Sequence, residues 1–459
     1  MSAVLADLLV MPHSVPLSDA VQVNPKIDRT ALTDETEVSF VPMAAVGAAS
    51  GHIDVSTVRP YAEVKKGYTH FRNGDVLFAK VTPCMENGKM AVARQLKNGV
   101  GFGSTEFHVL RPREGVDSQY IYYFVSSQTF RKEAARHMTG AVGLRRVPTT
   151  FLENAEIPLP PLQRQREIVA ELEKQFSRLD EAVANLKRVK ANLKRYKASV
   201  LKAAVEGSLV ETEATLARRE GRTYETGEQL LHRILKARRA KWSGKGKYRE
   251  PAPLDASLQS LPEGWTWAAV EMVCDAIVDC PHSTAKFQAQ GYPCVDTTWM
   301  TTEGLVPERA RFVDEATYKD RISRLAPKIG DIVFAREGTI GTAVLIPERM
   351  TPCLGQRVML LRTSPAYSNG LLVHVLHSEV VKTQYRAQAL GSTVAHINVG
   401  DVKRFAVPIP PASEQVRIVA EVDRHLSFVR EVEAEVDTSL KRAQSLRQSV
   451  LSKNFSRQS

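Results

Sequence analysis

Cysteine is scarce in this sequence and follows no pattern. The 459 residues contain five cysteines, with no Cys-x-x-Cys pair and no cysteine–histidine spacing of the kind that binds zinc. An odd number of widely separated cysteines also argues against a disulfide framework. We therefore expect reduced thiols, no metal site in this chain and a cytoplasmic protein.

Long apolar runs are also missing. No stretch reaches the roughly 18 consecutive apolar residues that a membrane-spanning helix needs. The apolar N-terminal segment, residues 3–15, contains Asp7 and His13 and has neither a basic start nor a small-residue cleavage site. We expect no membrane partner and no signal peptide.

The sequence lacks the motifs of several enzyme classes. It has no G-x-x-x-x-G-K-[ST] phosphate loop, no H-E-x-x-H zinc motif and no G-x-S-x-G nucleophile motif. Asn24-Pro25 is followed by Lys26, so the Asn-Pro-Pro-aromatic motif of adenine-amino methyltransferases is absent. Residues 101–103 form a Gly-x-Gly without a third glycine. We predict no catalytic residue and no cofactor in this chain, since the alternative, a stand-alone DNA methyltransferase or nuclease, would need such a motif.

Positive charge is what the composition does supply. Lys and Arg number 62 against 51 Asp and Glu, which gives a net charge of +11 and a pI near 9.3. This balance favours a polyanionic partner such as nucleic acid, and the alternative is a basic soluble protein without one. The length and the ordinary hydrophobic fraction of 43% predict two or three domains.

The chain contains an internal repeat. Residues 157–161 read Ile-Pro-Leu-Pro-Pro and residues 407–411 read Val-Pro-Ile-Pro-Pro, an offset of 250 that continues into the helical sequence that follows. Farther upstream, residues 74–80 match residues 330–336 at an offset of 256. Two collinear matches with a small drift indicate a tandem duplication of a unit of about 250 residues.

Each repeat begins with an α+β sequence. Short runs rich in Val, Ile, Leu and Phe predict strands at residues 75–81, 107–111, 331–336 and 357–362. Apolar residues at helical spacing predict helical segments over residues 119–137 and 369–389. Each repeat therefore predicts a mixed α/β domain.

Each repeat ends in a long helix with a near-heptad apolar stripe. We predict that the two stripes pair through Leu172, Phe176, Leu179, Val183, Leu186, Leu193, Val422, Val429, Val432, Val436, Leu440 and Leu446. The alternative is that each stripe packs on its own domain. A helix of about 40 residues is about 60 Å long, too long to be covered by one domain of about 150 residues, so mutual pairing is the economical solution.

These features predict two similar mixed α/β domains separated by two long antiparallel coiled-coil helices, with pseudo-twofold symmetry. The expected boundaries are a first domain at 1–160, a long helix at 161–206, a basic linker with a short helix at 207–260, a second domain at 261–411 and a second long helix at 412–459. The short helix of the linker is expected at residues 227–242, before a Gly/Lys-rich and proline-marked stretch.

Glycine-containing polar loops in the two domains are the candidate DNA-binding positions. In the first repeat these are Lys80, Thr82, Asn87, Lys89, Thr139, Arg145 and Arg146. In the second repeat they are Arg336, Thr339, Ser392, Thr393, His396 and Asn398. Small residues permit close backbone approach, and Arg, His and Asn can bond phosphates or base edges. The alternative is a set of glycine-marked turns with solvated side chains.

The first long helix also carries a run of basic residues. Residues 182–205 include seven Lys and Arg and no acidic residue. Such a run is usually a solvated helix face, but it also suits a phosphate backbone or an acidic partner protein.

Several of these segments resemble one family. They are Leu261-Pro262-Glu263-Gly264-Trp265, the proline-marked segments 157–165 and 407–415, the Gly-Asp strands at 74–75 and 330–331, and the turn at 391–393. Together they are similar, over nearly the whole chain, to the specificity (S) subunits of type I restriction–modification systems. The first domain departs from the pattern because it has no Leu-Pro-x-Gly-Trp opening.

The resemblance implies a non-catalytic DNA-binding subunit with two target-recognition domains, each reading one half of a split asymmetric site in double-stranded DNA. It also implies that the helices hold the domains apart and dock two modification (M) subunits. Those subunits would carry S-adenosylmethionine and methylate adenine, and restriction (R) subunits, when present, would use ATP and Mg. The remaining hypothesis is a coiled-coil scaffold without a DNA role.

Overall fold

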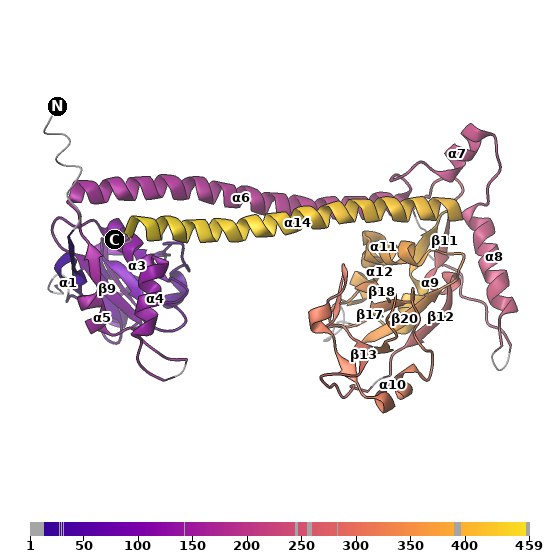
Figure 1. The fold of residues 1–459 in the computed structure, drawn as a ribbon, viewed down its shortest axis with the longest axis horizontal. Helices are drawn as coiled ribbons and strands as arrows, with labels where there is room; N and C mark the ends of the chain where they lie inside the picture. The colour runs from indigo at the N-terminus through magenta and orange to yellow at the C-terminus, as the bar shows by residue number, and fades with distance from the viewer. Residues whose placement is uncertain are drawn as a thin grey trace. The chain divides into compact units, whose positions relative to one another are not determined.

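The structure is a computed structural model that describes residues 13–26, 28, 30, 32–141, 143–243, 247–254, 259–281, 283–389 and 396–455. The chain forms two compact units (Figure 1). Unit 1 comprises Met1–Arg188 and Val436–Ser459, and unit 2 comprises Val189–Glu435. Each unit therefore combines one mixed α/β domain with one part of each long helix.

The central sheet of unit 1 is antiparallel and four-stranded. Its strands lie in the order β2 (Val21–Val23), β9 (Phe107–Pro112), β6 (Val76–Ala79) and β7 (Met90–Val92). The strands predicted at residues 75–81 and 107–111 are thus confirmed as β6 and β9. All four residues of β6 are buried, as expected of a strand covered on both faces.

A second sheet packs beside the first in unit 1. Its strands lie in the order β4 (Val58–Pro60), β3 (Glu37–Val41), β8 (Val100–Gly103) and β5 (Thr69–Arg72), with β3 and β8 parallel. A short ribbon of β1 (Ser14–Pro16) and β10 (Glu156–Pro158) closes the domain. Gly101, in β8, lies so close to the Phe71 ring that a Cβ there would stand 2.3 Å from a ring carbon, so this Gly-x-Gly is a packing feature.

Helices cover the two sheets of unit 1. They are α1 (Leu17–Ala20), α2 (Tyr61–Val64), α3 (Ser118–Ser126), α4 (Gln128–Arg136) and α5 (Thr149–Asn154). Of these, α2 packs on β3 and β4 of the second sheet. The helical segment predicted at 119–137 is two helices, because Ser127 adopts an extended conformation and its hydroxyl caps α4 by accepting a hydrogen bond from the Phe130 amide.

Unit 2 repeats this architecture. Its central sheet has the matching strand order β12 (Cys274–Asp279), β20 (Val358–Thr363), β17 (Ile332–Ala335) and β18 (Ala343–Leu345). Its helices are α9 (Val270–Val273), α10 (Glu315–Ile322), α11 (Asn369–His377), α12 (Glu379–Ala389) and α13 (Val399–Arg404), of which α10 packs on a smaller sheet of the unit. The strands predicted at 331–336 and 357–362 are confirmed as β17 and β20, and Ser378 breaks the predicted 369–389 segment as Ser127 does in unit 1.

The remaining strands of unit 2 form small sheets. They are β16 (Phe312–Val313), β13 (Tyr292–Val295) and β19 (Cys353–Leu354) in one sheet, the hairpin β14 (Met300–Thr301) and β15 (Gly304–Leu305), and the ribbon β11 (Thr266–Ala269) and β21 (Ala406–Ile409). The ribbon corresponds to the β1–β10 ribbon of unit 1. The small sheets differ from the second sheet of unit 1, so the repeats share one layer and diverge in the other.

A buried ion pair recurs at the same place in both central sheets. Asp75 accepts two hydrogen bonds of 2.8 Å from Arg111, and Asp331 accepts bonds of 2.8 and 2.7 Å from Arg362. Each aspartate also accepts the backbone amide three residues before it, from Arg72 or Lys328. These contacts tie the turn before β6 or β17 to the neighbouring strand, and they show that the duplication preserved a specific bond.

The glutamine that opens each long helix has the same two partners in both repeats. The Gln165 amide donates to the Pro160 carbonyl and its oxygen accepts from the Asp117 amide. Gln415 repeats these bonds with the Pro410 carbonyl and the Ser368 amide. The glutamines therefore anchor each long helix to the start of the helix that covers the sheet.

The two long helices are α6 (Leu162–Glu206) and α14 (Ala412–Phe455), and they pack together in each unit (Figure 1). In unit 1, Asp180 pairs with Arg447 at 2.6 Å. In unit 2, the Tyr196 hydroxyl lies 2.6 Å from Nδ1 of His425. The partner number falls as the α6 number rises, so the helices are antiparallel, as predicted.

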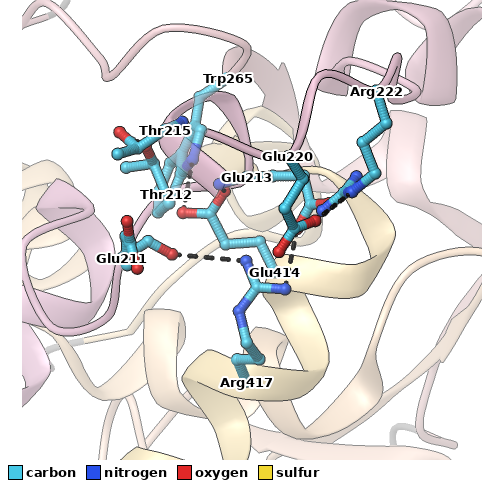
Figure 2. A network of polar contacts seen from close by, with 9 residues as sticks. All are labelled: Glu211, Thr212, Glu213, Thr215, Glu220, Arg222, Trp265, Glu414 and Arg417. Atoms are coloured by element: carbon cyan, nitrogen blue, oxygen red, sulfur yellow. Dashed lines mark hydrogen bonds and ion pairs between the residues drawn. The ribbon is translucent and has the colours of Figure 1, made fainter. Parts of the chain in front are cut away.

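The linker after α6 is folded against unit 2 and contains α7 (Glu213–Glu220) and α8 (Gly227–Ala240). Figure 2 shows the polar network that fixes its first turn. Glu414, at the start of α14, accepts hydrogen bonds from the Glu213 amide and from the Trp265 indole. Arg417 and Arg222 pair with the Glu213 carboxylate at 2.8 and 2.6 Å.

Burial and pairing act in opposite directions on these two carboxylates. Burial raises the pKa of Glu414 above its usual value. Burial also acts to raise the pKa of Glu213, but hydrogen bonds from Arg417 and Arg222 outweigh it and the pKa lies below the usual value. The network therefore holds an ionised Glu213 between two guanidinium groups and makes the linker a fixed part of unit 2.

Asp331→Asn tests the recurring ion pair. All four tryptophans lie in unit 2, so tryptophan fluorescence during urea unfolding reports this unit. We expect the free energy of unfolding to fall by about 3–5 kcal/mol, because the change leaves the Arg362 guanidinium without its counter-charge. Glu315→Gln, which removes an exposed pair with Lys319, should change it by less than about 1 kcal/mol. Equal decreases in both variants would contradict a special role for the buried pair.

Candidate nucleic-acid interface

Three loops meet beside the C-terminal end of β6 in unit 1. The Lys80 amide donates to the Glu106 carbonyl, and the Val147 amide donates to the Lys80 carbonyl. The Thr82 hydroxyl donates to the Arg145 carbonyl at 3.0 Å. The segment from β6, the residue before β9 and the hairpin before α5 thus form one surface.

The Glu106 carboxylate fixes the position of one positive charge on this surface, the Arg146 guanidinium. Arg146 donates to both carboxylate oxygens of Glu106, with distances of 2.7 and 2.9 Å. The hydrogen bond from Arg146 lowers the pKa of Glu106 below its usual value. Arg145 lies 3.9 Å from Glu86 and is exposed. Thr139, exposed, pairs with Arg146 through the backbone. The structure therefore brings Lys80, Thr82, Thr139, Arg145 and Arg146 together.

Two other predicted residues of unit 1 lie on the β6–β7 loop. Asn87 is exposed, and its backbone amide donates to the Pro83 carbonyl. Lys89 is partly buried, and its ammonium group donates to the Met43 carbonyl at 3.0 Å. Lys89 therefore supports the second sheet, whereas Asn87 is free to meet a ligand.

Unit 2 has the same pair of backbone hydrogen bonds, which we call the backbone frame. The Arg336 amide donates to the Arg357 carbonyl, and the Ile397 amide donates to the Arg336 carbonyl. These bonds match those of Lys80 in unit 1, with Arg357 in the place of Glu106. The frame is preserved while the charge at one of its positions is reversed.

Arg336 differs from Lys80 in exposure. Its side chain is buried, with 7% of the residue exposed, and pairs with Asp279 at 2.7 Å. One of its terminal nitrogens donates to the Ile397 carbonyl. Arg336 therefore stabilises the loops from inside the domain, and its side chain does not face a ligand.

The other described residues of this set in unit 2 are exposed. Thr339 lies in the turn between β17 and β18, and its hydroxyl is 3.5 Å from the Thr297 carbonyl. His396 forms a backbone bridge with Glu337, and Asn398 precedes α13. Ser392 and Thr393 lie outside the described residues.

The turn that presents Thr339 depends on a glycine. Gly341 has a φ of +82°, and a Cβ there would stand 2.3 Å from the Tyr385 hydroxyl oxygen. No other residue fits this close approach without displacing Tyr385, so Gly341 sets the shape of the loop.

Several residues of the two surfaces were not predicted from the sequence. Glu106 fixes Arg146 in unit 1. In unit 2 the equivalent position is the basic Arg357, and its partner at 3.4 Å is the acidic Glu337. Glu106 directly precedes β9 and Arg357 directly precedes β20, at an offset of 251. Extending the repeat comparison to the residues flanking the strands would have found them.

The residues predicted to pair the helices differ in exposure. Six are buried, and they are Leu172, Phe176, Leu193, Val422, Val429 and Val436. Five are partly buried, and they are Leu179, Val183, Leu186, Val432 and Leu440. Leu446 is 54% exposed and lines a groove between the helices of unit 1 with Ala182, Leu186 and Ala443. The helix pair thus leaves an apolar strip at its surface.

The basic run on α6 lies on exposed helix faces. Lys187, Arg188, Lys194 and Arg195 are exposed, and Lys197 pairs with Glu303 at 2.9 Å. Within the described part of the chain, no group of three or more His, Cys, Asp or Glu side chains is placed to hold a metal ion. No helix in that part is both long and apolar enough to cross a bilayer.

The chain matches a family model and several known proteins. The type I restriction modification DNA specificity domain matches residues 14–195 and 292–442. The specificity subunits of the type I restriction enzymes EcoAI and EcoEI of Escherichia coli are 28% and 26% identical to this chain, each over 89% of it and 76% of the relative.

Solved structures share the fold. A chain from a type I R-M system, solved in work on complex assembly and conformational transition, has a TM-score of 0.68 at 21% identity and covers 96% of both chains. The HsdS subunit from Thermoanaerobacter tengcongensis has a TM-score of 0.53 at 20% identity, with the same coverage. The mixed α/β domains and paired long helices are thus those of solved specificity subunits.

In specificity subunits the reaction chemistry and its cofactors reside on the modification and restriction subunits, which agrees with the lack of catalytic motifs in this sequence. The duplicated domains, the paired helices and a family match over most of the chain lead to one conclusion: this chain belongs to the DNA specificity subunits of type I restriction–modification systems.

Proposed function

We propose that each unit reads one half of a bipartite, asymmetric site in double-stranded DNA. The observation that carries the proposal is the shared backbone frame with different side chains. In unit 1 the frame presents Lys80, Arg145 and Arg146, whereas unit 2 presents Thr339, His396 and Asn398. Because base identity is read by side chains at fixed backbone positions, two such surfaces would recognise two different sequences.

We propose that Arg145 and Arg146 contribute differently to this readout. The guanidinium of Arg146 is held in one orientation by Glu106, which suits the two acceptors of a guanine edge. Arg145 is less restrained and suits a phosphate. Asn87, at the tip of the neighbouring loop, would lie close to the same groove.

The helix pair would hold the domains apart with pseudo-twofold symmetry and dock two M subunits. The groove in unit 1 supports the docking role, because Leu446 exposes apolar surface that a partner helix would bury. The M subunits would bind S-adenosylmethionine and methylate adenine. R subunits, when present, would add ATP- and Mg-dependent cleavage, and the complex would act in the cytoplasm on double-stranded DNA.

Exchange of residues 1–156 for the first domain of another specificity subunit tests the independent reading of half-sites. Methylome sequencing of cells that contain the M subunit should show one bipartite motif, and the exchange should alter only one half of it. An exchange of the second domain, residues 261–411, is the matched control and should alter only the other half. A change in both halves after either exchange would contradict independent reading.

An insertion of four residues within the 172–200 segment tests whether the helices set the spacing. One extra turn adds about 6 Å, so the gap between half-sites should change by one or two base pairs, given about 3.4 Å per pair. The same four residues inserted after Pro251, in the linker, should leave the gap unchanged. An unchanged gap in both variants would show that the helices do not act as a spacer.

Leu446→Asp tests the docking role of the groove. A charge on the apolar strip should weaken binding of the M subunit by about ten-fold or more, because burying an unpaired carboxylate is costly. Ile329→Asp is the control, since Ile329 is also more than half exposed but lies in a turn of unit 2. Calorimetry of M-subunit binding is the measurement, and equal affinities for both variants would rule the groove out.

A further inference from the structure

The linker carries one of the two largest concentrations of positive charge in the chain, the other being residues 182–205. Residues 227–250 contain eight Lys and Arg against two Glu, so this segment of 24 residues carries +6 of the net charge of +11. The other basic segment, 182–205, lies on α6, and the helix that packs on α6, α14, carries the acidic residues Glu431, Glu433 and Glu435. The linker segment is therefore the less compensated of the two concentrations of charge.

The linker presents this charge on a rigid element. Thr226 and Gln229 form a capping box at the start of α8, and Leu230 and Ile234 are buried in the core of unit 2. The Gly227 amide donates to the Gly264 carbonyl at 2.7 Å. With the network of Figure 2 holding the preceding turn, α8 is fixed to its domain and is not a loose tether.

Basic side chains cover the outer face and the end of α8. Lys236, Lys247 and Arg249 are exposed and form no ion pair with any residue that the structure describes. Arg239 pairs with the exposed Glu250, a contact that contributes little and that a phosphate can replace. Arg233 donates two hydrogen bonds to the partly buried Glu225 and is not available in the same way.

Aromatic rings lie among these basic groups. Trp242 is 49% exposed and meets Tyr248 edge-on, with ring centroids 5.8 Å apart. The Arg239 guanidinium lies 5.8 Å from the centre of the Tyr248 ring. Trp242 adds an exposed ring beside these groups, whereas Tyr248 is partly buried. Lys and Arg gathered on one face are the electrostatic footprint of a nucleic-acid surface.

The position of α8 separates it from the proposed reading loops. In the central sheet of unit 2, β12 and β18 are the two edge strands. The turn with Thr339 leads into β18, while α8 packs on α9, which precedes β12, and its Lys241 pairs with Asp275 of β12. Figure 1 shows α8 running along this side of the unit, away from the start of α14. The turn with Thr339 thus lies at the sheet edge opposite to α8, whereas α13, which follows Asn398, packs on α9 as α8 does. We expect a duplex held at the turn with Thr339 to reach α8 only with DNA beyond the recognised half-site.

We propose that α8, together with described residues that follow it, forms a second DNA-binding surface, which contacts the phosphate backbone of duplex DNA flanking the target. We call it the linker surface and define it by Lys236, Arg239, Trp242, Lys247 and Arg249. It rests on the proposed reading of DNA by the two domains, and it adds affinity without sequence preference.

The test uses the complex of the full chain with its M subunits and the triple variant Lys236→Gln/Lys247→Gln/Arg249→Gln. Two duplexes carry the methylated motif, one ending at the motif and one extended by about 25 base pairs on each side, longer than a typical interface covers. Binding is followed by fluorescence anisotropy over a series of salt concentrations. The control variant, Lys66→Gln/Lys132→Gln/Lys328→Gln, removes three exposed lysines elsewhere.

On the extended duplex, the triple variant should lower the slope of log affinity against log salt by about 0.9 for each phosphate that it no longer neutralises. The control variant should keep the wild-type slope, and on the short duplex all three proteins should bind alike. An unchanged slope on the extended duplex would overturn the proposal, and so would an equal weakening on both duplexes. Dissociation of the M subunits from the variant complex would also overturn it, by making this a protein-binding surface. Failure of the wild-type complex to prefer the motif would instead refute the proposed reading by the domains.

Discussion

The length of the two apolar stripes is the constraint on which the rest of the structure depends. A helix of 45 residues cannot bury its stripe on one small domain, so α6 and α14 must cover each other. Because the pairing is antiparallel, each unit takes helical segments from distant parts of the chain. Leu172 and Leu451 therefore share the core of unit 1, and Val200 and Val422 share the core of unit 2. Each domain of this chain is complete only with both helices.

Duplication preserved the parts that hold each domain and changed the parts that face outward. The pairs Asp75–Arg111 and Asp331–Arg362 occupy the same place in the two sheets, since removal of either partner would leave a buried charge. Substitutions on the proposed reading surfaces leave no charge buried without a partner. At one shared backbone position, unit 1 has Glu106, which pairs with Arg146, and unit 2 has Arg357, which pairs with Glu337. The place of Arg146 is taken in unit 2 by the exposed His396. Divergence at a fixed frame is what independent specificity requires.

The opening segment of the second domain shows how one repeat acquired an attachment that the other lacks. Trp265 donates to Glu414 at the start of α14, and Glu414 also accepts the Glu213 amide of the linker. At the equivalent position, 250 residues earlier, α6 carries Arg164, which pairs with Glu167 of its own helix. The Leu-Pro-x-Gly-Trp segment is thus part of the linker anchorage, which explains why a domain that follows a linker carries it and the first domain does not.

The sequence alone determined the duplication, two of the four central strands in each repeat and the two long helices, because these depend on local periodicity and on repeated segments. It also singled out Lys80 and Arg145, which flank elements that the repeat defines. It did not show that Ser127 and Ser378 break the covering helices, because apolar spacing continues through both. Nor did it separate Lys80 from Arg336, which have the same place in the repeat. Only the tertiary structure decided that Arg336 is buried against Asp279, that Leu446 is exposed and that the linker is fixed to unit 2, because burial and charge pairing join residues that lie far apart in the chain.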